Sequence, residues 1–142
     1  MLDVEERELF LAQPRVAVLS IADAGGRPPS TLPTWYAYQP GGNLAVITRE
    51  GKRKSRLIRA AGQVSLCVQH PEPPYRYVSV EGVVVVQEPA TREQMRPIMA
   101  RYLPADDVEA HVEWEADGGN AAGRPEYIEI RPERWSTADF SR

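Results

Sequence analysis

Residues 44–59 read LAVITREGKRKSRLIR, and this stretch shows how the chain alternates between strands and short helices. The apolar run at 44–47 predicts a buried strand, because short apolar runs bounded by turn residues are typical of strands. Thr48 and Gly51 then mark a strand end and a turn, after which spaced apolar residues predict a short helix. The residues expected on the inner side of that helix are Leu57, Ile58, Ala60 and Ala61.

The same stretch concentrates positive charge in a chain whose formal net charge is −3. One acid, Glu50, is accompanied by the cations Arg49, Lys52, Arg53, Lys54, Arg56 and Arg59. The start of a helix offers free backbone N–H groups and the positive end of its dipole to an anion. Lys and Arg add charge-assisted bonds to phosphate oxygens. The stretch therefore predicts a phosphate site for a small ligand; a solvated helix face, or a patch for nucleic acid or a membrane surface, is the alternative.

Length and composition limit the other possibilities. A chain of 142 residues, 42% of them hydrophobic, suits one domain over residues 1–142. The acidic balance argues against nucleic acid as a partner. Cys67 is the only cysteine, which excludes an internal disulfide and a cysteine-rich zinc site. No apolar run approaches transmembrane length and the first residues are acidic, so we expect a cytoplasmic protein without a membrane partner.

Turn residues and hydrophobic patterns divide the rest of the chain into short elements. Asp3 and Glu6 have the spacing of a capping box, which predicts a first helix that ends at Pro14. Strands are expected at about 15–21, 30–38, 44–48, 63–68, 75–87 and 127–130, and further helices at about 92–102 and 106–116. Asp/Gly turns between the first strands indicate hairpins. We therefore predict a mainly β protein with a few helices, an antiparallel barrel rather than a doubly wound sheet.

Several motifs occur in order along this framework. They are Arg15–Ser20 followed by Asp23–Pro28, then Pro33-Thr34-Trp35-Tyr36, Thr48 with Lys54 and Arg56, Arg59–Leu66, and Val80-Glu81-Gly82. Over about residues 5–135 their order resembles the pyridoxamine 5′-phosphate oxidase-like superfamily. The resemblance implies a split antiparallel β-barrel (the FMN-binding split barrel), Greek-key-like, with short flanking helices.

Within that superfamily the chain looks most like the flavin/deazaflavin oxidoreductases. Those are homodimers that bind coenzyme F-420 or FMN in a groove between subunits. The similarity implies a cofactor ring along Thr34, Trp35 and Tyr36, with Thr48 near the junction of ring and phosphate. The phosphate would lie on Arg49, Lys52, Lys54 and Arg56. Tyr77 would reach the site from the second subunit. Lys52 stands where the oxidase pattern has Ser, whereas Leu57 stands where relatives often carry Asn. The added charge favours coenzyme F-420, whose tail carries a phosphodiester and glutamate carboxylates, over FMN.

The resemblance implies an oxidoreductase that transfers hydride between coenzyme F-420 and a small organic substrate. The cofactor carries that chemistry, so no catalytic side chain is required and none is predicted. Two alternatives stay open. The first is an FMN-dependent reductase or oxidase on the same barrel, and the second is a non-catalytic flavin- or haem-related binding module. Arg131 and Arg134 lack the substrate pattern of true pyridoxamine phosphate oxidases, so that activity is not expected.

The two histidines and Trp114 are not expected to take a main part in the site. His70 is expected in a loop at the barrel rim, and His111 on the surface of an acidic helix without the spacing of a metal ligand. Trp114, on the same helix, is expected to serve packing. The loop at 118–125 and the C-terminal helices are expected to shape the substrate cavity.

Overall fold

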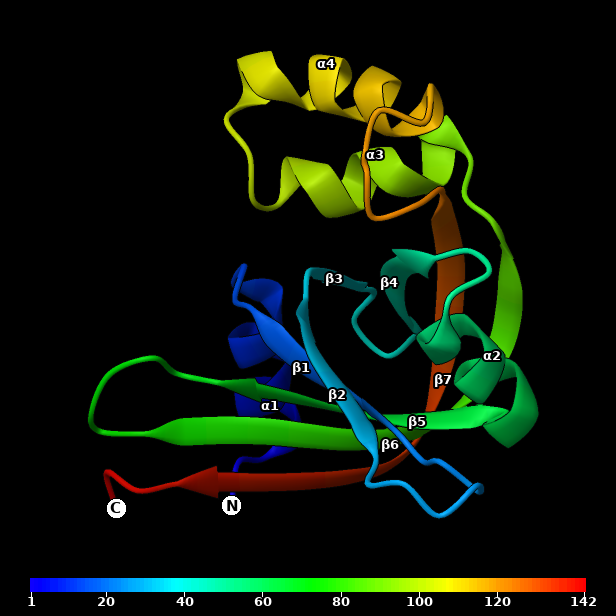
Figure 1. Cartoon of the computed structure of the whole chain (residues 1–142). Coiled ribbons are helices and arrows are strands. Elements are labelled where there is room, and N and C mark those ends of the chain that lie inside the picture. The colour runs from blue at the N-terminus through cyan, green and yellow to red at the C-terminus, as the bar shows by residue number, and fades with distance from the viewer.

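The computed structural model describes residues 1–142 as an antiparallel seven-stranded sheet with four helices (Figure 1). The helices are α1 (Val4–Ala12), α2 (Arg53–Ala61), α3 (Arg92–Ala100) and α4 (Ala105–Ala116). The strands are β1 (Ala17–Ile21), β2 (Ser30–Thr34), β3 (Tyr36–Tyr38), β4 (Leu44–Arg49), β5 (Gln63–Gln69), β6 (Arg76–Pro89) and β7 (Pro125–Asp139). Their order across the sheet is β2-β1-β5-β6-β7-β4-β3. The predicted mainly β, antiparallel architecture is confirmed.

Trp35 divides the strand predicted at 30–38 into two. The part before it, β2, pairs with β1, and the part after it, β3, pairs with β4, at the opposite edge of the sheet. Because a single residue joins the two edge strands, the sheet must curl until its edges meet there, as a split barrel requires. Pro33 fits this position, since proline lacks the N–H that a central strand would need.

The last strand is much longer than the predicted 127–130. β7 extends over fifteen residues: residues 125–130 pair with β4 on one side, and residues 126–139 pair with β6 on the other. Pro132 and the charges around it hide the alternation in the sequence, and shifts of register between β6 and β7 absorb the irregularity. At one shift the backbones approach so closely that a Cβ on Gly82 would lie 2.8 Å from the Arg131 carbonyl oxygen. Only glycine fits there without displacing its neighbours.

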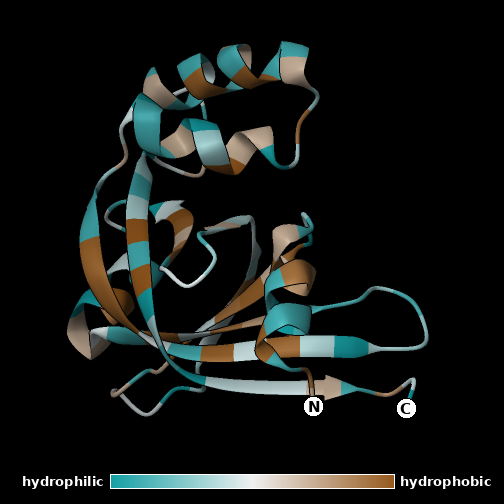
Figure 2. Cartoon of the chain, turned by 180° about the vertical axis from the view of Figure 1, so that it is seen from behind, coloured by the Kyte–Doolittle hydropathy of each residue, from teal (hydrophilic) through white to brown (hydrophobic).

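Two hydrophobic clusters support the elements. The larger fills the barrel and is closed by Phe10 and Leu11 of α1, whose predicted Asp3–Glu6 capping box is present. Along the strands, hydrophobic residues alternate with hydrophilic ones (Figure 2). The smaller cluster lies within the α3–α4 hairpin, which stands over one end of the barrel (Figure 1). No helix has the length and apolar character needed to cross a membrane.

Candidate functional site

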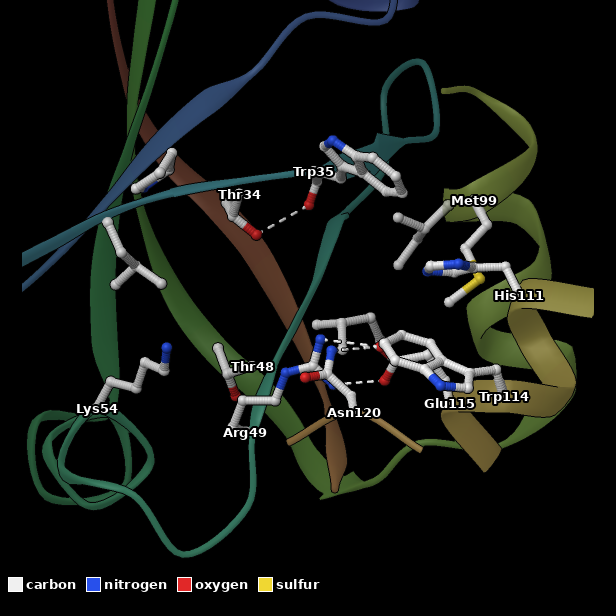
Figure 3. A pocket seen from close by; sticks show the side chains of 14 residues that line it. Thr34, Trp35, Thr48, Arg49, Lys54, Met99, His111, Trp114, Glu115 and Asn120 are labelled. Atoms are coloured by element: carbon white, nitrogen blue, oxygen red, sulfur yellow. Dashed lines mark hydrogen bonds and ion pairs between the residues drawn. The ribbon is translucent and has the colours of Figure 1, made fainter. Parts of the chain in front are cut away.

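A cavity of about 470 Å³ lies where the barrel meets the α3–α4 hairpin (Figure 3). The barrel side and α2 contribute Leu32, Pro33, Thr34, Trp35, Ile47, Thr48, Arg49 and Lys54. The hairpin and the loop after it contribute Ile98, Met99, His111, Trp114, Glu115 and Asn120. The cavity thus has a cationic end at Lys54 and an aromatic end at the helices.

Of the nine residues predicted to bind a cofactor, the fold brings five to this cavity. These are Thr34, Trp35, Thr48, Arg49 and Lys54. Lys52 and Arg56 do not line it, but they are exposed on the same turn and helix as Lys54. The sequence therefore located one wall of the cavity and the positive charge beside it.

Helix α2 presents an uncapped start to this region. Lys52 is its N-cap residue and makes no capping bond through its side chain, and Gly51 provides the positive φ of 73° that the preceding turn needs. Because no side chain caps the first turn, its backbone N–H groups remain available to an anion. On the inner face of the helix Ile58 is buried, whereas Ala60, predicted to be inward, is exposed.

The cations of this segment fall into two groups. Arg49, Arg53 and Arg59 each form an ion pair with a carboxylate of the chain, respectively Glu115, Asp23 and Glu126. Lys52, Lys54 and Arg56 form no ion pair, and Arg56 bonds only the carbonyl oxygen of Gly51, at 2.9 Å. The second group is therefore the one whose charge is not compensated within the chain.

Arg49 is occupied by a buried acid. Glu115 is only 2% exposed, and both its oxygens accept bonds from the Arg49 guanidinium, while Asn120 donates a third bond at 2.8 Å. Burial alone would raise the pKa of Glu115, but the bonds from Arg49 and Asn120 outweigh it and lower the pKa below its ordinary value. The charge of Arg49 is therefore compensated within the chain, and its contact with a phosphate stays a prediction.

Thr48, near the end of β4, is buried and bonded within the chain. Its side chain is 1% exposed, and its hydroxyl donates to Glu126 Oε1 at 3.3 Å. Gln87 donates to the same oxygen at 3.2 Å. The hydroxyl is thus engaged in holding β4 to β7, next to the wall of the cavity.

Tyr36 and Tyr77 lie away from the cavity. Tyr36 is fully buried in the barrel, its hydroxyl donates to the Leu11 carbonyl at 2.9 Å, and burial raises its pKa to about 12. Its amide donates to the Tyr102 hydroxyl at 3.1 Å, so neither its side chain nor its N–H is free for a cofactor ring. Tyr77 lies half-buried on β6 beside Phe140, and its role in a second subunit stays a prediction.

The sequence predicts His111 on the helix surface and Trp114 in packing, whereas the structure places both on the wall of the cavity. His111 lines the cavity, with its ring 6.3 Å from Trp35 and 5.3 Å from Trp114 between ring centroids. The signal that could have found them is their spacing with Glu115, since positions i, i+3 and i+4 share one face of a helix. His70, by contrast, lies in its loop against the Glu72 carbonyl and outside the cavity.

Comparisons with known proteins match this framework. A family model described as Pyridoxamine 5′-phosphate oxidase matches residues 4–139. No curated protein matches the chain. Among solved structures, an F-420 reductase is 26% identical with a TM-score of 0.69, over 91% of this chain and 94% of that one.

Two further structures show the likeness of fold alone. A conserved hypothetical protein from Mycobacterium tuberculosis is 19% identical with a TM-score of 0.76, over 99% of this chain and 86% of that one. A FAD-binding protein from Mesorhizobium loti is 23% identical with a TM-score of 0.65, over 96% and 94% of the two chains. The split barrel predicted from the motifs is confirmed.

Proposed function

Because this chain belongs to the pyridoxamine 5′-phosphate oxidase family of flavin-binding split barrels, we propose that it is an oxidoreductase that uses coenzyme F-420. In this proposal it transfers hydride between that cofactor and a small organic substrate. The observation that carries the proposal is the uncompensated charge of Lys52, Lys54 and Arg56 at the uncapped start of α2, next to a cavity large enough for a ring.

The donor set fits a cofactor with an anionic tail. Lys54 is on the first turn of α2 and lines the cavity, whereas Lys52 and Arg56 are exposed outside it on the same turn and helix. Each can form a charge-assisted bond to a phosphate or carboxylate oxygen. Three such cations suit the several anionic groups of coenzyme F-420 better than the single phosphate of FMN. The 26% identity to an F-420 reductase supports the same choice.

The cavity has the properties that a cofactor ring needs. Thr34 and Trp35 form one wall, and Ile47, Ile98 and Met99 supply apolar side chains that exclude water. When bound, a deazaflavin supplies the hydride chemistry itself. The chain's residues then bind the tail, orient the ring and keep the cavity dry, which requires no acid–base pair at this site.

FMN is the second candidate, and the family match favours it because members bind flavins. The same turn would hold its phosphate and the same wall its ring. An FMN-dependent reductase or oxidase would therefore differ from the first proposal in the cofactor and not in the site. A binding module without catalysis remains as the outcome of a test in which a cofactor binds and nothing turns over.

We also propose that the chain acts as a homodimer. Tyr77 would then reach the cofactor from the second subunit, because within its own chain it lies outside the cavity. The exposed side chains of Tyr75 and Phe140 near it support a contact surface at this end of the molecule. Sedimentation equilibrium checks the association, and Tyr77→Ala would weaken cofactor binding only if the dimer completes the site.

A parallel titration with oxidised coenzyme F-420 and with FMN tests the proposed function. Binding can be followed by intrinsic fluorescence, since Trp35 and Trp114 line the cavity. Tighter binding of the deazaflavin supports the proposal, and tighter binding of FMN moves the protein to the second candidate. Binding of neither would refute the assignment of the cationic turn.

A further inference from the structure

At its aromatic end the cavity carries two residues, His111 and Trp114, that the cofactor assignment does not use. The imidazole of His111 lies between two indoles, with centroids 6.3 Å from Trp35 and 5.3 Å from Trp114. Trp35 is itself fixed, because its ring stacks on Tyr102 at 4.8 Å with an interplanar angle of 6°. Met99 lies beside this group (Figure 3). We call Trp35, Met99, His111 and Trp114 the aromatic slot.

His111 brings polar atoms to this apolar group. Its side chain is half-buried and points into the cavity (Figure 3), and neither ring nitrogen forms a hydrogen bond within the chain. A ring N–H that faces a cavity without a protein acceptor is available to an acceptor atom of a ligand.

The charges near the slot limit what it can take. Glu115 is the only carboxylate lining the cavity, and its charge is compensated by the Arg49 guanidinium. Lys54, the remaining cation of the cavity, is on the opposite side, on α2 (Figure 3). The slot therefore offers aromatic faces, a thioether and one hydrogen-bond donor, but no uncompensated acid.

We propose that the aromatic slot binds a second, neutral ligand with a flat aromatic ring, and that His111 donates a hydrogen bond to an acceptor atom attached to that ring. The ring would pack against Trp35 and Trp114, where aromatic pairs gain more than their buried area alone provides. The identification of this ligand as the substrate rests on the proposed function. Binding to the slot does not, because it requires no cofactor.

Acetophenone is a suitable probe, because it combines a flat ring with a carbonyl acceptor. Ethylbenzene keeps the ring without the acceptor, and cyclohexyl methyl ketone keeps the acceptor without the aromatic ring. Binding is followed by NMR through the indole N–H signals of Trp35 and Trp114. Trp135 packs against Tyr38 in the barrel and outside the cavity, so its signal is an internal control.

We expect acetophenone to shift the signals of Trp35 and Trp114 and to leave that of Trp135 unchanged. Its affinity should exceed that of either analogue by roughly 2- to 10-fold, the range for one aromatic contact or one neutral hydrogen bond. Equal affinities for the three compounds, or shifts at Trp135 of the same size, would overturn the proposal.

Variants separate the donor from the ring. His111→Phe keeps an aromatic ring in the slot and removes the donor, so acetophenone should bind as weakly as ethylbenzene, whose own affinity is unchanged. Trp114→Ala should weaken the binding of both acetophenone and ethylbenzene. Because Trp114 is 44% exposed, the fold should tolerate the change. Glu109→Gln, on the exposed face of α4, is the matched control and should bind acetophenone as the native chain does.

Failure of this inference can be told apart from failure of the proposed function. Lys54→Ala should weaken cofactor binding and leave acetophenone binding intact, and His111→Phe should do the reverse. If acetophenone and the cofactor instead exclude each other, both rings share one site and the proposal of a second ligand is wrong.

Discussion

Replacing Glu115 by glutamine should destabilise the protein, because Arg49 would lose the carboxylate that compensates it. Removing one partner of a buried ion pair costs about 3–5 kcal/mol. Arg49 is 19% exposed and also bonds the Gly123 carbonyl at 3.4 Å, and a glutamine oxygen can still accept one bond. We therefore expect a smaller cost than that range, about 2 kcal/mol. In urea this corresponds to a fall of about 1 M in the unfolding midpoint.

The effect should depend on pH with a definite sign. The folded-state pKa of Glu115 is lowered from its ordinary value of 4.5. Its contribution to stability is therefore fully present above pH 4.5 and is lost as the pH falls through the lowered folded-state pKa. The native chain and the variant should differ most at neutral pH and converge in acid.

Urea unfolding at several pH values measures both expectations. Glu113→Gln is the matched control, since Glu113 is on the same helix but pairs with Arg92 at the surface, and it should leave the midpoint unchanged. If Glu115→Gln unfolds at the same urea concentration as the native chain at neutral pH, Arg49 and Glu115 are not paired in solution and the reasoning fails.

Three further substitutions probe other parts of the structure. Lys54→Ala should weaken binding of the cofactor by about 1–3 kcal/mol, the range for a charge-assisted bond, and fluorescence titration should show no such loss for the distant control Arg134→Ala. Gly82→Ala should destabilise the protein by about 1–3 kcal/mol, measured by urea unfolding, because the new Cβ would lie 2.8 Å from the Arg131 carbonyl oxygen of the backbone. An unchanged unfolding midpoint would contradict the register of β6 and β7. Tyr36→Phe should cost about 0.5–1.5 kcal/mol through the bond lost to α1, visible as a lower Tm, whereas a higher Tm would show that the hydroxyl is not bonded there.

The parts of the fold that could be predicted depend on neighbouring residues. The capping box of Asp3 and Glu6 and the start of the cationic helix are decided within one helical turn, and both are present. The division at Trp35 could not be predicted in this way. Residues 30–38 contain no Gly, Asn or Asp that would mark a turn. Only the closure of the barrel decides that the two halves pair at opposite edges.

The candidate site shows the same limit. Lys54 and Thr48 were found because a strand, a turn and a helix start follow each other in the chain. His111 was missed because its neighbours in sequence are acidic, while its neighbours in space come from β2, α3 and the barrel edge. The spacing of His111, Trp114 and Glu115 indicates that they share one face of α4, but it does not show that this face is turned toward the barrel.

The loop after α4 is bonded to both ends of the cavity, so a change in this loop affects both ends. The loop after α4 bonds the cationic turn through the Arg124 carbonyl, which accepts from the Glu50 amide at 2.9 Å. Asn120 of the same loop donates to Glu115, and Glu115 holds Arg49. A change that loosens this loop would therefore move both α4, with His111 on it, and the turn between β4 and α2. For this reason the affinities for the cofactor and for acetophenone must be measured on the same variants. Only substitutions that change one affinity without the other, such as Lys54→Ala and His111→Phe, can assign a function to either end of the cavity.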